Sequence, residues 1–234
     1  PFDTVFHFGE YSRIVQSFND IQYVAKTNMG GTPCILELCR HWGAKLIYSA
    51  SSSKFGNDGK DENLSPYAWM KAKMVEYIKN YNDWYGLEYQ ICYFFNVYGP
   101  GQIMEGDYAT VVGIFERQYN AGQKCTVVTP GNQSRDFTHV NDIVSGVIKS
   151  AMYLHKATKD NLADIEREWY LKSGKDITII DVAEMFGDWE MIPERKGERL
   201  NSSIFDNSTC EKLGWEPTHS LEKWVTQQKN VLAT

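Results

Sequence analysis

Two short apolar segments flank a long amphipathic one in the first half of the chain, and this order limits the folds open to it. Residues 45–50 and 89–95 are apolar enough for buried strands, whereas residues 66–84 repeat apolar side chains at helical spacing. A strand, a helix and a second strand in this order predict a right-handed parallel crossover. We therefore expect an α/β fold built on a doubly wound parallel sheet.

Further segments continue the alternation of strands and helices. Thr178 has the side chain of a helix cap, and Ser65 with Pro66 marks the start of the long helix. The later segments are shorter and more mixed, so we expect a smaller α/β lobe after a change in organisation near Pro100. Strands are predicted at residues 4–8, 125–128 and 169–171, and helices at about 21–28, 33–42, 108–119, 141–153, 178–186 and from 220 onward.

Composition and charge disfavour several classes of protein. A chain of 234 residues with 42% apolar and 14% aromatic residues has the composition of a soluble globular protein. Its net charge of −6, without a basic block, disfavours nucleic acid binding. No apolar run reaches the ~20 residues of a membrane helix, and the first residues do not read as a signal peptide. We therefore expect neither nucleic acid nor a membrane as a partner.

The placement of cysteine and histidine indicates a compartment and disfavours a metal site. The five cysteines are scattered and form no Cys-x-x-Cys pair, which favours reduced thiols in a cytoplasm. The five histidines lack the spacing of metal ligands. We predict a cytoplasmic protein that holds no metal.

Ser51, Tyr67 and Lys71 form the most informative group of polar residues. A lysine four residues after a tyrosine shares a helix face with it, and its charge lowers a phenol pKa that is normally about 10. Such a tyrosine can act as a general base, while the serine hydroxyl orients the same substrate oxygen. Taken alone, Tyr-x-x-x-Lys is more often a half-buried aromatic beside a solvated lysine. Ser51 follows a predicted strand, where doubly wound sheets bind ligands, and this favours the functional interpretation.

Six short motifs accompany this group along nearly the whole chain. They are Phe-His-Phe-Gly at residues 6–9, Asn-Met-Gly-Gly-Thr at 28–32, Asn-Val-Tyr-Gly-Pro at 96–100, Arg-Asp-Phe-Thr-His-Val at 135–140, Arg-Lys-Gly-Glu at 195–198 and Leu-Gly-Trp-Glu-Pro at 213–217. In this order the chain resembles the extended short-chain dehydrogenases/reductases, and within them the NAD-dependent epimerase/dehydratase family. The resemblance implies that residues 1–100 are the C-terminal part of an NAD-binding Rossmann-like domain. It also implies that residues 101–234 are mainly a nucleotide-sugar-binding lobe, interleaved with the sheet.

The resemblance further assigns residues to each ligand. The residues expected to bind NAD are Phe8, Gly9, Asn28, Tyr67 and Lys71. Those expected to bind the nucleotide sugar are Ser51, Ser53, Asn96, Arg135, Arg195 and Glu198. The arginines suit a diphosphate because a planar guanidinium can hold two oxygens at once. Plainer roles stay open: Ser53 can form a turn bond to the backbone, Asn96 can shape a turn, and Arg135 can form a surface ion pair.

The loop at residues 50–56 indicates which reaction the resemblance implies. Its sequence, Ala-Ser-Ser-Ser-Lys-Phe-Gly, has hydroxyls where the related 4,6-dehydratases carry an acidic pair. A hydroxyl of ordinary pKa is a poor base for a carbon-bound proton, so dehydration is disfavoured, and decarboxylation with it. The loop is similar to that of the 4-epimerases. This implies an NAD-dependent nucleotide-sugar 4-epimerase, with a UDP-hexose as the favoured substrate.

The mechanism implied by the resemblance gives each catalytic residue a role. Tyr67 takes the proton of the sugar 4-hydroxyl while a hydride passes from carbon 4 to NAD, and Ser51 hydrogen-bonds to the same oxygen. Lys71 holds the nicotinamide ribose, and the 4-keto sugar turns before the hydride returns to its other face. A reductase or another epimerase of the family is the alternative enzyme. A homodimer through the long helix and residues 33–42 is also implied.

The family's phosphate-binding Gly-x-x-Gly-x-x-Gly turn, and the acid about 20 residues after it, are absent from this sequence. The sequence therefore resembles a Rossmann-like fold without its N-terminal part. Two hypotheses follow. The sequence is part of a longer enzyme, which the intact site motifs favour, or it is a non-catalytic sugar-nucleotide binding fragment.

Overall fold

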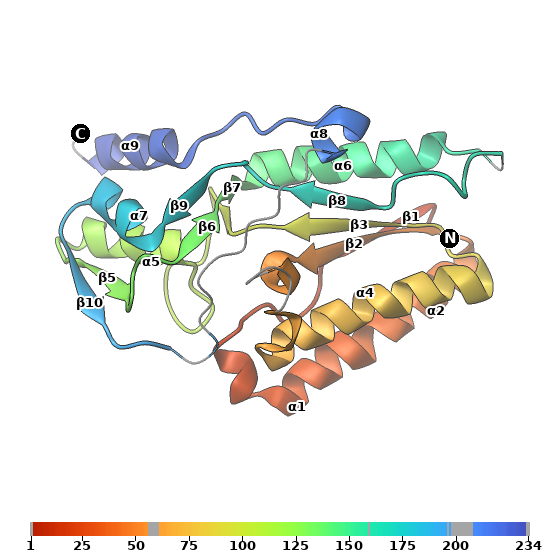
Figure 1. Cartoon of the computed structure of the whole chain (residues 1–234), viewed down its shortest axis with the longest axis horizontal. Helices are drawn as coiled ribbons and strands as arrows, with labels where there is room; N and C mark the ends of the chain where they lie inside the picture. The colour runs from red at the N-terminus through yellow and green to blue at the C-terminus, as the bar shows by residue number, and fades with distance from the viewer. Residues whose placement is uncertain (1, 56–60, 159, 196, 198–207, 233–234) are drawn as a thin grey trace.

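The computed structural model of the chain describes residues 2–55, 61–158, 160–195, 197 and 208–232. At its centre lies a parallel sheet of four strands within these residues, drawn as a stack of arrows in Figure 1. In spatial order the strands are β1 (Thr4–His7), β2 (Lys45–Ser51), β3 (Tyr89–Phe94) and β8 (Glu168–Leu171). Every adjacent pair runs parallel, which confirms the predicted crossover and the α/β Rossmann-like fold.

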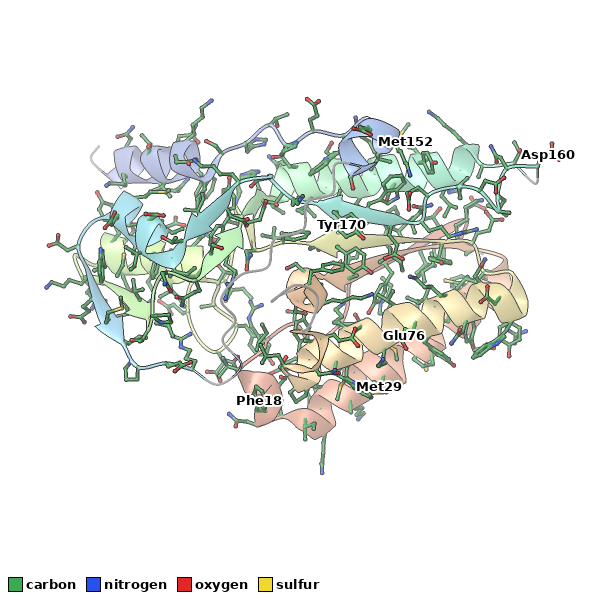
Figure 2. All side chains as sticks on the ribbon, viewed as in Figure 1. Phe18, Met29, Glu76, Met152, Asp160 and Tyr170 are labelled. Carbon is green, nitrogen blue, oxygen red and sulfur yellow. The ribbon has the colours of Figure 1, made fainter. Side chains whose placement is uncertain are left out.

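Helices cover both faces of this sheet (Figure 1). On one face lie α2 (Gly30–Trp42) and α4 (Pro66–Tyr85), and on the other lies α6 (Val140–Lys156). The side chains of the strands alternate accordingly. Tyr48 belongs to the core beneath α2 and α4, whereas its neighbour Ile47 belongs to the core beneath α6. Both cores are filled by side chains, as Figure 2 shows.

The second lobe has its own apolar core. Helices α5 (Val111–Asn120), α7 (Ile179–Phe186) and α9 (Leu221–Leu232) contribute Phe115, Phe186 and Val225 to it. Two strand pairs complete the lobe. They are the parallel pair β5 (Cys125–Val128) and β10 (Trp189–Ile192), and the antiparallel pair β6 (Ser134–Asp136) and β9 (Asp176–Thr178).

The two lobes interleave along the chain. After the second lobe has begun, α6 and β8 return to the central sheet, and α8 (Ser208–Leu213) packs beside them. A short parallel pair, β4 (Val97–Tyr98) with β7 (Thr138–His139), lies between the lobes. The chain passes between the two lobes several times, so the domain division at residue 100 stays a proposal.

Local chemistry explains where the elements begin. Thr178 caps α7, as predicted, because its hydroxyl accepts a hydrogen bond from the Asp181 N–H at 3.1 Å. Helix α5 was expected to start near residue 108, but it begins at Val111. There Thr110 caps it by accepting from the Gly113 N–H at 3.2 Å. The helix expected from residue 33 begins earlier, at Gly30.

Short helical segments connect the main elements. The stretch expected as one helix at 21–28 is α1 (Ile21–Val24) followed by the wider π-helical turn η2 (Ala25–Met29), which runs directly into α2. The 3₁₀ turns are η1 (Gln16–Phe18), η3 (Ser52–Phe55) and η4 (Asp61–Asn63). Across the described part of the chain, no helix has both the length and the apolar character needed to cross a membrane.

Gly146 provides a test of the packing between α6 and the sheet. A Cβ at this position would lie 2.5 Å from Leu171 Cδ2 and 3.1 Å from Trp215 Nε1, which itself donates to the Asp142 carbonyl. We expect Gly146→Ala to lower the free energy of unfolding by about 1–3 kcal/mol, because overpacking outweighs the gain of about 1 kcal/mol in helix propensity. Urea denaturation measures the change.

Gly31 on α2 is the matched control, since a Cβ there meets nothing within 4 Å. Gly31→Ala should leave the free energy of unfolding unchanged or raise it by up to about 1 kcal/mol. Equal effects of the two substitutions would contradict the packing described for α6.

Candidate active site

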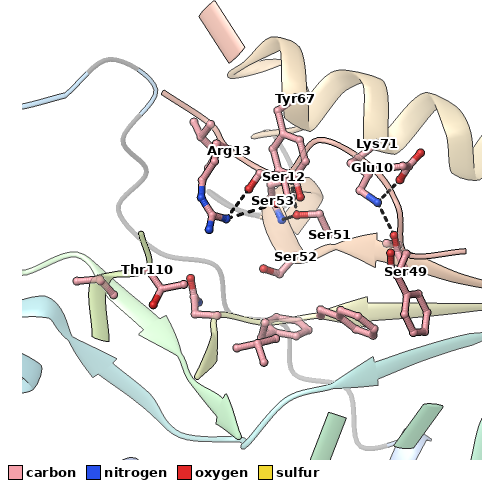
Figure 3. Close-up of a pocket in the computed structure, with 18 of the residues that line it drawn as sticks. Glu10, Ser12, Arg13, Ser49, Ser51, Ser52, Ser53, Tyr67, Lys71 and Thr110 are labelled. Atoms are coloured by element: carbon pink, nitrogen blue, oxygen red, sulfur yellow. Dashed lines mark hydrogen bonds and ion pairs between the residues drawn. The ribbon is translucent and has the colours of Figure 1, made fainter. Parts of the chain in front are cut away.

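A cavity of about 440 Å³ lies beyond the carboxyl ends of the central strands, as Figure 3 shows. Phe8 follows β1, Ser51 ends β2 and Phe94 ends β3, and all three line it. Tyr67 and Lys71 enter from α4. The structure therefore brings the three predicted catalytic residues to one cavity, at the edge where parallel sheets of this kind bind ligands.

The start of α4 fixes the backbone of Tyr67. Ser65 caps the helix by accepting from the Ala68 N–H at 3.1 Å, and the Tyr67 N–H donates to the Ser17 hydroxyl at 3.3 Å. Both N–H groups belong to the first turn of α4, where backbone N–H groups have no acceptor within the helix. Ser17 was missed by the sequence analysis. It lies fifty residues away in the turn η1, and no local pattern links it to Tyr67.

Lys71 is buried, with 5% of its surface exposed. Its ammonium donates to the Glu10 carboxylate and, at 2.5 Å, to the Ser49 carbonyl, as the dashed lines in Figure 3 mark. It also lies 4.7 Å from the centre of the Tyr48 ring, a cation–π contact. The ammonium is thus held between β2 and the loop after β1.

Glu10 is the most important residue that the sequence analysis left without a role. Only 1% of its side chain is exposed, and it accepts hydrogen bonds from Tyr48 at 2.8 Å and from Thr32 at 2.6 Å, besides its bond to Lys71. In the sequence Glu10 is a single carboxylate in the loop after a predicted strand, with no partner at helical or strand spacing. Only the fold shows that this carboxylate points inward.

Two of the groups around Glu10, Tyr48 and His7, are neutral. Burial raises the pKa of Tyr48 well above its ordinary value, and the charge of Glu10 adds to the effect, so Tyr48 stays a hydrogen-bond donor. Burial also lowers the pKa of His7, against the opposing charge of Glu10 and with a smaller contribution from Lys71. Of the groups that contact the Glu10 carboxylate, Lys71 therefore carries the positive charge.

The serine loop forms a local turn beside the cavity. Ser51 Oγ accepts from the Ser53 N–H at 3.2 Å and from the Ser53 hydroxyl at 2.8 Å. The Ser53 hydroxyl thus bonds to the Ser51 side chain rather than to the backbone, and both residues also line the cavity. The bonds fix the hydroxyl of Ser51 at the end of β2.

A second cavity of about 230 Å³ contains three of the predicted substrate residues, Asn96, Arg135 and Arg195. Asn96 donates to the Asp136 carbonyl at 2.8 Å, and Arg135 is buried and donates to the Ser134 carbonyl at 2.7 Å. The two cavities share wall residues, which are Ile14, Asn96, Ala109 and Val111. Glu198, the remaining predicted substrate residue, lies outside the described residues.

The predicted cofactor residues divide into two groups. Phe8 is half-exposed and lines the first cavity, where its ring contacts Phe94. Gly9 follows it in the chain, and a Cβ there would meet nothing within 4 Å. Asn28 is fully buried outside the cavity lining. Its amide binds the backbone of Tyr11 at 2.8 and 3.0 Å, which holds the loop after β1. Its role at the cofactor stays a prediction.

These residues match a known family model. Residues 1–161 match the model described as the NAD dependent epimerase/dehydratase family. The chain belongs to this family. Among the described residues, no group of three or more His, Cys, Asp or Glu side chains is placed to hold a metal ion.

Three family members show how far the likeness extends. The chain is 29% identical to a putative UDP-glucose 4-epimerase of Methanocaldococcus jannaschii, over 97% of this chain and 76% of that protein. It is 31% identical to a UDP-glucuronate 4-epimerase of Thermodesulfobacterium geofontis, over 97% and 71%. A UDP-glucose 4-epimerase of Thermotoga maritima, solved with UDP-glucose, superposes with a TM-score of 0.85 at 26% identity, over 99% of this chain and 77% of that one.

His139, in the family's Arg-Asp-Phe-Thr-His-Val motif, has a structural role. Its Nδ1 accepts from the Asn141 N–H at 3.2 Å at the start of α6, and its ring stacks on His219 with centroids 4.2 Å apart. Burial, and then the neighbouring His219, lower the pKa of His139, while Asp142 opposes them. Protonation would remove the cap acceptor.

The free energy of unfolding should therefore decrease as the pH is lowered from about 7.5 to about 5.5. Unfolded His139 takes up a proton near its ordinary pKa of about 6.5, whereas the folded side chain resists protonation, so acid favours the unfolded state. His139→Asn keeps a cap acceptor and should make this fall smaller in urea denaturation at the two pH values. The exposed His155 serves as the control through His155→Asn. The same fall in wild type and His139→Asn would contradict the assignment.

Proposed function

We propose that this protein is an NAD-dependent nucleotide-sugar 4-epimerase, with a UDP-hexose as the favoured substrate. One observation carries the proposal: Ser51, Tyr67 and Lys71 line a single cavity whose serine loop offers hydroxyls rather than a free acid. Glu10 is the acidic residue among those described in the lining, and it is bonded to Lys71. Elimination and decarboxylation both use an acid in this loop, so neither is favoured.

The residues of the first cavity fit the nicotinamide half of the cofactor. The aromatic face of Phe8, the open space beside Gly9 and the ammonium of Lys71 would hold it at the carboxyl edge of the sheet. NAD, when bound, supplies the oxidation and the reduction at carbon 4 of the sugar. The protein itself has to position that carbon and move the proton on its oxygen.

The second cavity suits the nucleotide diphosphate. Arg135 and Arg195 bring two guanidinium groups to it, and Asn96 lies where it joins the first cavity. A guanidinium fork matches two phosphate oxygens at once. A diphosphate held there would place the attached hexose in the first cavity, within reach of the serine loop. We include Glu198 in this site as a proposal from the family motif alone.

Each catalytic residue then has a defined task. Tyr67 takes the proton from the sugar 4-hydroxyl and later returns it, and Ser51 hydrogen-bonds to the same oxygen. Lys71 favours the ionised phenol through its charge and binds the nicotinamide ribose. Because the cofactor is regenerated in each cycle, no net consumption is expected, whereas the alternative reductase would consume reduced cofactor in stoichiometric amounts.

The protein is further proposed to be a cytoplasmic homodimer. Its described cysteines are free thiols, which suits a reducing compartment. The outer surfaces of α2 and α4 expose Leu38, Trp84 and Tyr85, apolar side chains of the kind found at subunit contacts.

Tyr67→Phe tests the proposed base. With NAD present, wild-type protein should convert one member of a panel of UDP-glucose, UDP-N-acetylglucosamine and UDP-glucuronate into its 4-epimer, identified by chromatography. Loss of the phenolic oxygen should lower turnover by about 10²–10⁴-fold, the usual size of general-base catalysis, with thermal unfolding unchanged. Tyr77→Phe is the control, a tyrosine on the same helix that does not line the cavities. Near-normal turnover in Tyr67→Phe would remove that residue from its role.

Arg13 favours a second candidate substrate, a nucleotide sugar with an acidic group on its hexose. The guanidinium lines the first cavity and donates to the carbonyls of Ser12, at 2.9 Å, and Tyr108. No carboxylate forms an ion pair with it in the described part of the chain. Burial lowers the pKa of Arg13, and the Tyr67 and Tyr108 phenols oppose this. Arg13 and Tyr67 line the same cavity. A hexuronate carboxylate would supply the missing charge.

Arg13→Gln separates the two candidates. If the substrate is acidic, the substitution should weaken binding of UDP-glucuronate, measured by calorimetry, by about 10–100-fold and leave binding of UDP unchanged, since a charge-assisted hydrogen bond is lost. An equal loss for UDP and UDP-glucuronate would place Arg13 on the diphosphate instead. Wild-type preference for the neutral UDP-hexoses would favour the first candidate.

A further inference from the structure

We propose that Glu10 is a positioning residue for Lys71, which fixes the ammonium and offsets its charge beside the proposed base Tyr67. This inference rests on the proposed function, because it concerns the same site. It goes beyond that function by adding a carboxylate to a group of serine, tyrosine and lysine. The loop that supplies this carboxylate lies directly after β1.

Contacts with several elements of the fold hold the Glu10 side chain in place. Its side chain is almost fully buried and binds residues from three separate elements: Lys71 of α4, Tyr48 of β2 and Thr32 of α2. The loop that carries Glu10 is itself anchored, because the buried Asn28 amide holds the backbone of the next residue, Tyr11. Glu10 therefore has one position, and the ammonium has a fixed partner.

A buried ion pair is a weak source of stability, because removing two charges from water offsets most of their attraction. Apolar residues of similar volume often serve a fold as well or better. Lys71 has a proposed catalytic task that needs its charge, and this explains why an ammonium is buried here. Glu10 then offsets the free-energy cost of burying this charge and orients the amine toward the cavity.

The charged and titratable groups around Lys71 come from every element that packs on it. Tyr67 lies one turn earlier on α4, Tyr48 lies beneath the ammonium, and Glu10 is bonded to it. His7 at the end of β1 lies 3.9 Å from the Glu10 carboxylate and interacts electrostatically with Lys71. Arg13 lines the same cavity and interacts electrostatically with Tyr67. Glu10 is the negative charge in this group.

The sign of the effect follows from this arrangement. A lone ammonium beside Tyr67 would favour the ionised phenol strongly, whereas an ammonium paired with a carboxylate favours it less. An epimerase needs its base to take a proton and then return it to the same oxygen. An ammonium whose charge is offset by a carboxylate leaves both proton transfers, to the phenol and back to the substrate oxygen, accessible. This fits a reversible reaction.

Glu10→Gln tests the inference through the pH dependence of turnover. The amide has the same shape but no charge, so the phenol would face an uncompensated ammonium. We expect the limb of the pH–turnover profile that reports loss of the base's proton to shift to lower pH by about one unit or more, with KM for the nucleotide sugar unchanged. Glu10→Asp, which restores the charge, should return the limb towards its wild-type position. An unshifted limb in Glu10→Gln, or a shift to higher pH, would overturn the proposal.

The matched control is Glu37→Gln. Glu37 on α2 also accepts from a tyrosine and a cation, Tyr81 and Arg40, but it is half-exposed and lies outside both cavities. This substitution should leave the pH profile in place. A shift as large as that of Glu10→Gln would mean that surface charge in general, rather than Glu10, sets the profile.

A double-mutant cycle provides a readout that needs no turnover. Glu10→Gln and Lys71→Met should each lower the midpoint of urea unfolding, because each leaves one buried charge without its partner. The double variant should lose less than the sum of the two, since neither charge is left alone. Additive losses would overturn the pairing. If no nucleotide sugar is converted by the wild type, the proposed function fails, while coupling in this cycle still establishes the pair.

Discussion

The contact between the Lys71 ammonium and the Glu10 carboxylate is the interaction on which the rest of the site depends. The ammonium is shielded from water, because Lys71 is buried and its amine lies over the Tyr48 ring. A charge in such a place persists only when it is paired and hydrogen-bonded, and Glu10 together with the Ser49 carbonyl meets this condition. The pair also joins α4 to the ends of β1 and β2. The helix that carries Tyr67 is thereby tied to the sheet edge.

A parallel sheet is what allows these residues to meet. Because the strands run in one direction, the chain leaves each of them at the same edge, and residues far apart in sequence arrive there together. Glu10 follows β1, Ser51 ends β2 about forty residues later, and Phe94 ends β3 after a similar interval. The crossover helix α4 returns over this edge and adds Tyr67 and Lys71. The topology alone thus produces most of the cavity wall.

The sequence predicts the parts of this structure that rest on local pattern. The apolar runs of β2 and β3 and the helical spacing of α4 have clear periods, and the Ser51, Tyr67 and Lys71 group has a recognisable order. The short strands such as β4 and β7 were not predicted, because two residues carry no period. Glu10 and Ser17 were missed for another reason. Their partners are 61 and 50 residues away, and only the fold shows that they contact.

The charge balance of the cavity limits the chemistry more than its shape does. The Glu10 carboxylate is already bonded to an ammonium and two hydroxyls, so it is a poor base for a carbon-bound proton. The serine loop adds hydroxyls that bond each other. What the cavity offers is a phenol beside a compensated ammonium. In the proposed reaction such a group would take the proton from an oxygen of the substrate and return it. That property suits a reaction that restores the oxidation state of its substrate more than one that removes water or carbon dioxide irreversibly.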